Sequence, residues 1–213
     1  MSPEQSSEPE SLRQRRARET RHEIEEAAFT LFELQGVEAT TASEIARRAG
    51  VSERTFFRYM QTKEDAVLGI YDEFARALHT GFVRRDADVP LMQSVCTAYR
   101  DVLADVGDGT SALGSSLKRL LRLSTTEPTI ARRIQERDRL ADRRLVRRLE
   151  IQLGDTPDKT LLAHTIVAVA GALTRSAVET WMDDQAHGIE GDCVAVFDRV
   201  VALAHTHLPA ISS

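Results

Sequence analysis

The sequence predicts an all-α protein of about nine helices, with a small three-helix module near the N-terminus and a larger helical domain after it. Apolar residues recur at helical spacing along most of the chain, and no convincing stretch alternates as a half-buried strand does. Short segments rich in Gly, Pro, Asp and Thr interrupt this pattern at helix-sized intervals. With 213 residues and 42% hydrophobic content, the chain is long enough to bury a core.

The first helix is expected to begin at Arg13 and to end at Gly36. Its apolar residues follow the i, i+3, i+4, i+7 spacing of an amphipathic helix, and they are Ile24, Ala27, Ala28, Leu31 and Phe32. Glycine suits the position after a helix C-terminus. Residues 1–12 are rich in Ser, Pro and Glu, which predicts a flexible tail.

Two short helices and the start of a fourth are predicted from their capping residues. Thr41-Ala-Ser-Glu44 is a capping box, and Gly50 should end the helix that begins there. Ser52 is a good N-cap for the next helix. The segment 62–65 resembles a further helix start, so we expect domains at 13–62 and 63–213.

The larger domain is predicted to hold about five more helices. They are separated by five segments rich in turn-forming residues, which are Asp86–Pro90, Gly107–Thr110, Ser124–Pro128, Gly154–Pro157 and Ala186–Asp192.

The two short helices have the composition of a helix-turn-helix. Ala46 is small enough for a crossing helix and Gly50 tolerates the positive φ of a tight turn. With Phe56 packed inward, the outer face of the second short helix is free to enter a major groove. Arginine and threonine can contact base edges there, so the candidate base-contacting residues are Ser52, Glu53, Arg54, Thr55 and Arg58.

Neighbouring residues are suited to contact with the DNA backbone. Thr40 and Thr41 precede a helix N-terminus, Tyr59 carries a phenol, and Lys63 stands at the next helix start. A basic arm at the start of the first helix, including Arg13 and Arg16, adds positive charge. Residues 11–63 carry a net charge of +2, although the whole chain carries −5.

The stretch TTASEIARRAGVSERTFFRYMQTKE resembles the DNA-binding signature of the TetR family of bacterial repressors, and the resemblance covers about residues 13–65. It implies a ligand-responsive repressor that binds a palindromic operator as a homodimer and is released by a small-molecule effector. Two residues depart from the family pattern. Phe57 replaces a frequent tyrosine and so lacks a hydroxyl for phosphate, and Met60 replaces a core phenylalanine.

One short helix reads few base pairs, so a dimer is expected. The segments 161–181 and 193–208 are apolar around much of their circumference and are the candidate interface. The interface candidates are Leu162, Ile166, Val169, Leu173, Val196, Val200 and Leu203. Small residues at 168, 171 and 172 would permit close helix approach. A helix that is merely central to its own monomer remains the alternative.

The resemblance also implies an effector pocket in the larger domain. Polar or aromatic side chains that could line an apolar pocket are Tyr99, His164, Arg175 and Trp181. The leucines at 78, 117 and 121, with Phe74, are interpreted as core. The arginine-rich segment 131–150 is interpreted as a solvated helix with an inward apolar stripe, in preference to a second nucleic-acid surface.

Other classes of function find little support in the sequence. No GxSxG, HExxH, GxGxxG or P-loop pattern is present, so an enzyme is not expected. Cys96 and Cys193 match no metal spacing, and neither a metal nor a cofactor is expected. No signal peptide or membrane span is apparent, which favours the cytoplasm of a bacterium. A helical protein-interaction module, or an activator without a small-molecule ligand, remains the alternative function.

Overall fold

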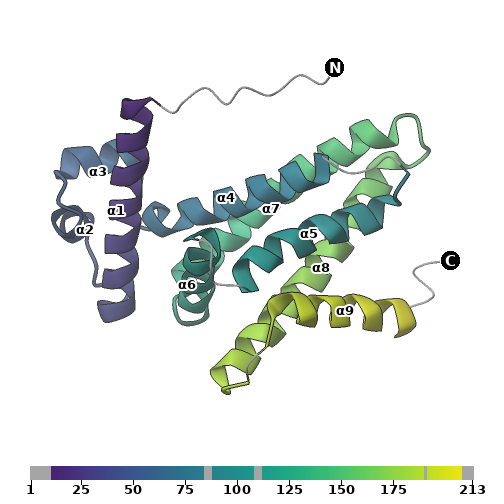
Figure 1. The fold of residues 1–213 in the computed structure, drawn as a ribbon. Helices are drawn as coiled ribbons and strands as arrows, with labels where there is room; N and C mark the ends of the chain where they lie inside the picture. The colour runs from purple at the N-terminus through teal and green to yellow at the C-terminus, as the bar shows by residue number, and fades with distance from the viewer. Residues whose placement is uncertain (1–10, 84–87, 108–111, 190, 208–213) are drawn as a thin grey trace. The chain divides into compact units, whose positions relative to one another are not determined.

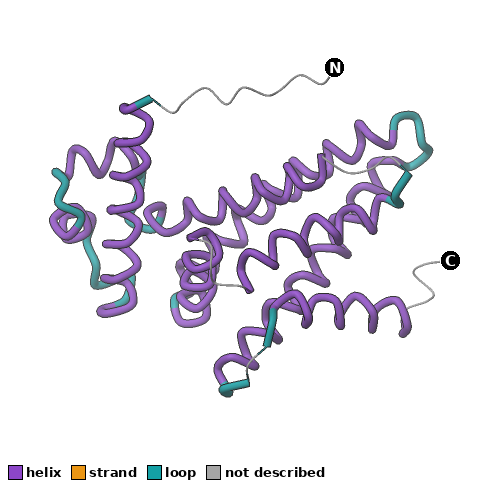
Figure 2. Tube along the Cα trace, in the orientation of Figure 1, coloured by secondary structure: helices purple, strands orange, loops and turns teal. Residues whose placement is uncertain are grey.

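The computed structural model describes residues 11–83, 88–107, 112–189 and 191–207. Over these ranges the protein consists of nine α-helices without a strand (Figures 1 and 2), so the predicted fold class is confirmed. The chain divides into two compact units, of which one ends at Leu68 and the other begins at Gly69, inside the fourth helix.

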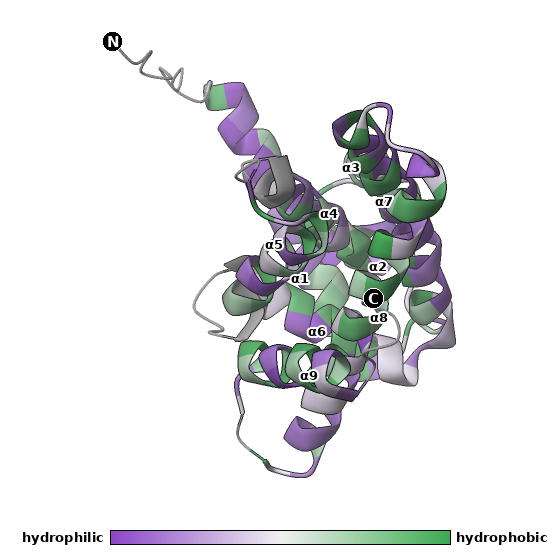
Figure 3. Ribbon diagram, turned by 90° about the vertical axis from the view of Figure 1, so that its right-hand side faces the viewer, coloured by the Kyte–Doolittle hydropathy of each residue, from purple (hydrophilic) through white to green (hydrophobic). Residues whose placement is uncertain are grey.

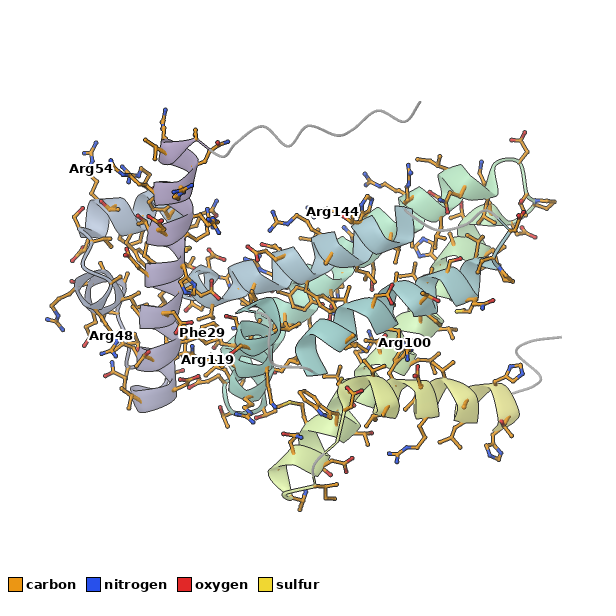
Figure 4. All side chains as sticks on the ribbon, in the orientation of Figure 1. Phe29, Arg48, Arg54, Arg100, Arg119 and Arg144 are labelled. Carbon is orange, nitrogen blue, oxygen red and sulfur yellow. The ribbon has the colours of Figure 1, made fainter. Side chains whose placement is uncertain are left out.

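The first unit contains three complete helices and the first turn of a fourth. These are α1 (Leu12–Gln35), α2 (Ala42–Arg48), α3 (Glu53–Tyr59) and the beginning of α4 (Asp65–Val83). The helix α2 packs against both α1 and α3. The core of the first unit consists of fully buried apolar side chains from all four helices. They include Ile24, Phe29 (labelled in Figure 4), Ile45, Phe56 and Leu68.

The helices of the first unit begin at side-chain caps. Ser11 and Gln14 form a capping box at the start of α1, so this helix begins one residue earlier than predicted. The expected tail, residues 1–12, otherwise lies outside the described residues. At α2 the predicted box is present, because Glu44 Oε2 accepts from the Thr41 backbone N–H at 2.8 Å. These bonds from Thr41 lower the pKa of Glu44.

The turn between α2 and α3 depends on a glycine. Gly50 has a φ of 69°, a left-handed conformation that side chains with a Cβ rarely adopt. The N–H of Val51 then donates to the Ala46 carbonyl at 2.9 Å, which closes the turn. Ser52 caps α3 by accepting from the Thr55 N–H at 3.1 Å. The angle between the two short helices therefore follows from local sequence.

The second unit contains the rest of α4 and five further helices, α5 (Leu91–Gly107), α6 (Ala112–Thr126), α7 (Pro128–Leu153), α8 (Lys159–Ala186) and α9 (Cys193–His207). The helix α8 packs against α5, α7 and α9, whereas α5 also packs against α6 and α9. The helix ends agree with the predicted breaks, two of which, 86–90 and 107–110, lie partly outside the described residues.

The helix α8 is buried along one face within its own chain, because its buried residues recur at helical spacing while Leu161, Leu162 and Ala168 are exposed. Its buried residues include Ala163, Val167, Ala170, Ala177 and Trp181. An 18-residue window of α8 has a mean hydropathy of 1.5, so among the described helices it alone has the length and composition of a membrane span. The core helix of a soluble protein meets the same criterion, and α8 contacts three helices of its own unit.

Two polar contacts join helices that are distant in sequence. Arg100 of α5, labelled in Figure 4, donates from Nε and Nη2 to the carboxylate of Asp198 on α9, at 2.9 and 3.0 Å. The Lys118 ammonium of α6 lies 4.9 Å from the centre of the Trp181 ring on α8. Both contacts connect parts of the second unit that the sequence separates by more than sixty residues.

Candidate nucleic-acid interface and ligand cavity

The helix α3 exposes a polar face to solvent and packs one aromatic ring into the core of the first unit. Phe56 is fully buried, whereas the side chains of Glu53, Arg54 and Arg58 are exposed. Figure 4 shows Arg54 standing out from the α3 ribbon. Within the described part of the chain, Arg54 makes no hydrogen bond or ion pair, so its guanidinium N–H groups are available to a partner.

Three of the other candidate base-contacting residues, Ser52, Thr55 and Arg58, already have side-chain partners in or next to α3. Arg58 lies 4.9 Å from the centre of the Tyr59 ring and donates to its hydroxyl at 3.4 Å. The hydroxyls of Ser52 and Thr55 are 2.9 Å apart and belong to the cap of α3. Of the two arginines on this face, Arg54 is therefore the one without a side-chain partner among the described residues.

Thr40 and Lys63 occupy positions that differ from those expected of phosphate-contacting residues. The side chain of Thr40 is buried, and its hydroxyl donates to the Gly36 carbonyl at 2.8 Å. The Lys63 ammonium donates to the carbonyls of Val37 and Thr40 at 2.6 and 2.8 Å, with a longer contact of 3.4 Å to Glu38. Three donors of one ammonium thus hold the loop before α2.

The role of Lys63 in the loop was not predicted from the sequence, because its partners lie at least 23 residues away. No local pattern marks such a contact. Thr41, by contrast, stays exposed at the α2 N-terminus, as expected of a side chain near DNA.

The basic arm is the first part of α1. Arg13 and Arg16 are exposed on helical turns, and the buried residues of α1 begin only at Ile24. These first turns are mainly hydrophilic (Figure 3). The arginines are therefore held on a regular helix rather than on an extended segment.

Sequence reasoning missed the exposure of an aromatic ring on α3. Phe57 is 55% exposed, and its ring stands edge-on to that of Phe56, with centroids 5.3 Å apart. The sequence had suggested only that Phe57 lacks a hydroxyl. Arg47 and Arg48 at the end of α2 are also exposed. Two adjacent arginines in a chain of net negative charge were the signal that could have added Arg47 and Arg48 to the predicted DNA-contacting residues.

The second unit contains a partly open cavity of about 1240 Å³ lined by α4, α5, α6, α7 and α8. Apolar side chains from all five helices line it, among them Phe74, Leu78, Leu103, Leu117, Leu145 and Val178. Phe74, Leu78, Leu117 and Leu121, which were interpreted as core, thus form part of a cavity wall. Its volume exceeds the roughly 300–1,000 Å³ of typical small-molecule sites.

Of the four predicted pocket residues, two line this cavity and two do not. Tyr99 of α5 and Arg175 of α8 are part of the lining. Trp181 is only 1% exposed and donates from Nε1 to the Gly191 carbonyl at 2.8 Å, so it belongs to the packed core. His164 is exposed near the start of α8, at a separate shallow hollow.

Two carboxylates of the cavity were missed. Asp138 and Asp142 of α7 line it together with Ile134, Ala141 and Leu145. The sequence contained a signal for them, since both aspartates share the helical face of the apolar stripe. The interpretation of residues 131–150 as a solvated helix did not single them out.

The candidate interface residues differ in their accessibility. Leu162 is 39% and Leu203 51% exposed, and the residues at 169, 173 and 200 are half-buried. Ile166 and Val196 are instead buried within their own chain. Gly171 faces the cavity, whereas the alanines at 168 and 172 are exposed. The accessible subset lies on α8 and α9, which pack together.

Comparison with known proteins agrees with this arrangement. Residues 24–68 match the family described as bacterial regulatory proteins, tetR family. The chain is 31% identical over 172 residues to the HTH-type transcriptional regulator TcmR of Streptomyces glaucescens, and the match covers 80% of this chain and 76% of that protein.

Solved structures share the fold. NalD, described as the secondary repressor of the MexAB-OprM multidrug efflux pump in Pseudomonas aeruginosa, superposes with a TM-score of 0.60 at 18% identity, covering 87% of this chain and 96% of NalD. The complex of SmeT with triclosan superposes with a TM-score of 0.52 at 17% identity, covering 86% and 90%. The chain therefore belongs to the TetR family and is a DNA-binding transcriptional regulator.

Proposed function

We propose that the protein is a homodimeric repressor that binds a palindromic operator and releases it when a small molecule occupies the cavity of the second unit. The observation that carries this proposal is the outer face of α3, where Arg54 is exposed and unpaired within the described residues while Phe56 fixes the helix from below. A recognition helix needs both a rigid anchor and free donors.

Within this proposal the residues of the first unit divide by the part of DNA that they contact. Arg54 reads a base edge, with guanine as the preferred partner of its two N–H groups. The exposed ring of Phe57 suits an apolar contact with a thymine methyl group. Thr41, Tyr59, Arg13 and Arg16 contact the phosphate backbone, which positions α3 without reading sequence.

A homodimer follows from the small size of α3. Seven residues of helix read one half-site, so useful specificity requires a second copy. Leu162 and Leu203 expose apolar surface on the packed pair α8 and α9, which supports an interface there. NalD, which shares the fold, is a repressor, and this likeness supports repression in preference to activation.

The cavity supports control by a small molecule. The SmeT structure of similar fold is a complex with triclosan. A cavity of about 1240 Å³ with a mainly apolar lining is suited to a small organic ligand. No observation on the described residues favours the ligand-free activator. We place the protein in the cytoplasm, where its DNA is.

The proposal is tested by selecting duplexes that bind the purified chain from a random DNA pool. The selected duplex should be a palindrome, and its affinity should fall with salt at a log–log slope of about −0.9 per phosphate contacted. Arg54→Ala should narrow the difference between selected and random DNA by about 1–3 kcal/mol. Arg139→Ala, which removes an exposed arginine from α7, is the control.

Two results would contradict the proposal. One is a pool that shows no enrichment over random DNA. The other is light scattering that finds a single chain on every duplex. If Arg54→Ala leaves base preference unchanged, the assignment of Arg54 as a base reader is wrong even where DNA binding itself is present.

A further inference from the structure

The cavity of the second unit contains polar groups that the chain itself does not pair. Asp138 and Asp142 lie four residues apart on α7 and so project from the same face. Tyr99 of α5 and Arg175 of α8 line the same cavity, and all four side chains interact electrostatically. Among the described residues, none of the four makes a hydrogen bond or an ion pair.

Tyr99 points to a ligand independently of the aspartates. Its residue is 94% buried, at a relative exposure of 6%, and its hydroxyl has no partner within the described residues. The hydroxyl is not sealed inside the protein but is open to the cavity, where a bound molecule can form a hydrogen bond with it.

The charges of the two aspartates contribute more to the electrostatic potential of the cavity than the charge of Arg175 does. Asp138 and Asp142 are half-buried, whereas Arg175 is exposed and its charge is better screened by water. The Nη1 atom of Arg175 lies 3.3 Å from where a Cβ of Gly171 would stand, so the guanidinium folds back along α8. The charge of Arg175 therefore offsets only part of that of the two less exposed carboxylates.

Burial raises the pKa of Asp138 to about 6, with a further increase from Asp142 and a smaller opposing effect of Arg175. Burial also raises the pKa of Asp142, against the opposing effect of Arg175. Burial therefore makes ionisation of both carboxyls cost free energy, and a positively charged partner would offset that cost. The remaining charged groups of the lining are all exposed, namely Arg76, His79, Arg122, Arg144, Glu179 and Asp183.

We propose that the cavity binds an amphiphilic organic cation, with its apolar body against the wall formed by Phe74, Leu103 and Leu117 and its positive centre beside Asp138 and Asp142. This inference rests on the proposed function, in which the second unit is the effector-binding unit. It adds the chemical class of the effector. A ligand with an N–H or O–H group within reach of Tyr99 would satisfy that hydroxyl as well.

The test compares two ions of nearly equal size and shape and opposite charge, tetraphenylphosphonium and tetraphenylborate. Calorimetric titration of the full chain at pH 7.5 should give at least tenfold tighter binding of the cation. Binding of the cation should weaken at pH 5, because protonated Asp138 no longer attracts it. Equal binding, tighter binding of the anion or binding of neither ion would overturn the proposal.

The variants locate the site. Asp138→Asn combined with Asp142→Asn should reduce the affinity for the cation at least tenfold, and thermal melting checks that this double variant is folded. Asp155→Asn removes the same charge from an exposed loop outside the cavity and should leave the affinity unchanged. An unchanged affinity in a folded double variant would overturn the proposal.

DNA release is measured separately from binding. If the cation binds through the aspartates and does not release the selected duplex, the ligand class stands and the proposed mode of control fails. If the chain binds DNA as a dimer but prefers the anion, the ligand class fails and the proposed regulator stands.

Discussion

The two units of this protein treat their polar groups differently. In the first unit Thr41, Ser52 and Lys63 each complete a cap or close a loop. Exposed arginines such as Arg54 lie on the surface of this unit, on the face proposed to meet DNA. In the second unit Asp138 and Tyr99 line a large cavity without a partner among the described residues.

This difference reflects two physical tasks. A unit that reads DNA gains from rigid presentation, because any freedom left in α3 lowers specificity. A unit that responds to a ligand must instead retain groups that are better satisfied in the bound state, because a ligand shifts an equilibrium only by its differential affinity. The variants below break or sharpen this comparison, from the largest expected effect to the smallest.

Removing the anchor of α3 should unfold the first unit selectively. Phe56→Ala deletes a fully buried ring and should cost about 3–5 kcal/mol of the free energy of unfolding. Phe57→Ala is the matched control on the same helix and should change stability by less than about 0.5 kcal/mol, because its ring is 55% exposed. Denaturant unfolding followed by circular dichroism measures both. Similar losses in the two variants would show that α3 is not anchored as described.

Lys63→Met should destabilise the first unit by about 2 kcal/mol, because it removes charge-assisted hydrogen bonds to the carbonyls of Val37 and Thr40. Lys159→Met removes a single exposed contact to Gly154 and should cost less than about 1 kcal/mol.

The salt dependence of DNA binding separates the two roles of Lys63. A positioning residue leaves the log–log slope unchanged while weakening selected and random DNA alike. A phosphate contact makes the slope shallower by about 0.9. A shallower slope without a loss of stability would mean that Lys63 contacts a DNA phosphate, as the sequence predicted.

Asp138→Asn should stabilise the second unit at neutral pH. The raised pKa of Asp138, about 6 in the folded chain, means that ionisation opposes folding. This penalty is absent below the ordinary pKa of 3.8, grows as the pH rises toward 6 and is complete above it. We expect a gain of about 1–2 kcal/mol at neutral pH and almost none near pH 4.

The pH dependence of unfolding measures this gain, with Asp155→Asn as the exposed control. A constant gain across the whole range would mean that packing, rather than charge, separates asparagine from aspartate at this position.

Gly171→Ala should have the smallest effect, a gain of about 0.5–1 kcal/mol from helix propensity. The nearest atom to the new Cβ is the end of the flexible Arg175 side chain, at 3.3 Å, which can move aside. Gly69→Ala on α4 meets no atom within 4 Å and is the control without displacement. Thermal melting measures both variants. A loss of stability in Gly171→Ala but not in Gly69→Ala would mean that the Arg175 guanidinium is held in place.

The helices and the head of the protein were predictable because their signals are local. Capping boxes, the Gly50 turn and apolar spacing each act within a few residues of the chain, and the structure places α2 and α3 where these signals predicted them. The family signature lies in the same segment, residues 24–68. Sequence alone therefore determined the fold class, the family and the exposure of Arg54 and Arg58 on α3, but not that of Phe57.

Only the tertiary structure decided which polar side chains are paired and where space is left between helices. Lys63 reaches carbonyls at least 23 residues away, and Trp181 proved to be core. Asp142 of α7 interacts electrostatically with Tyr99 of α5 and Arg175 of α8. A cavity forms where the side chains of several packed helices leave space between them. The periodicity of one helix indicates only which of its sides faces inward. That is why the sequence identified the DNA-binding unit, while the charge in the ligand site became visible only in the fold.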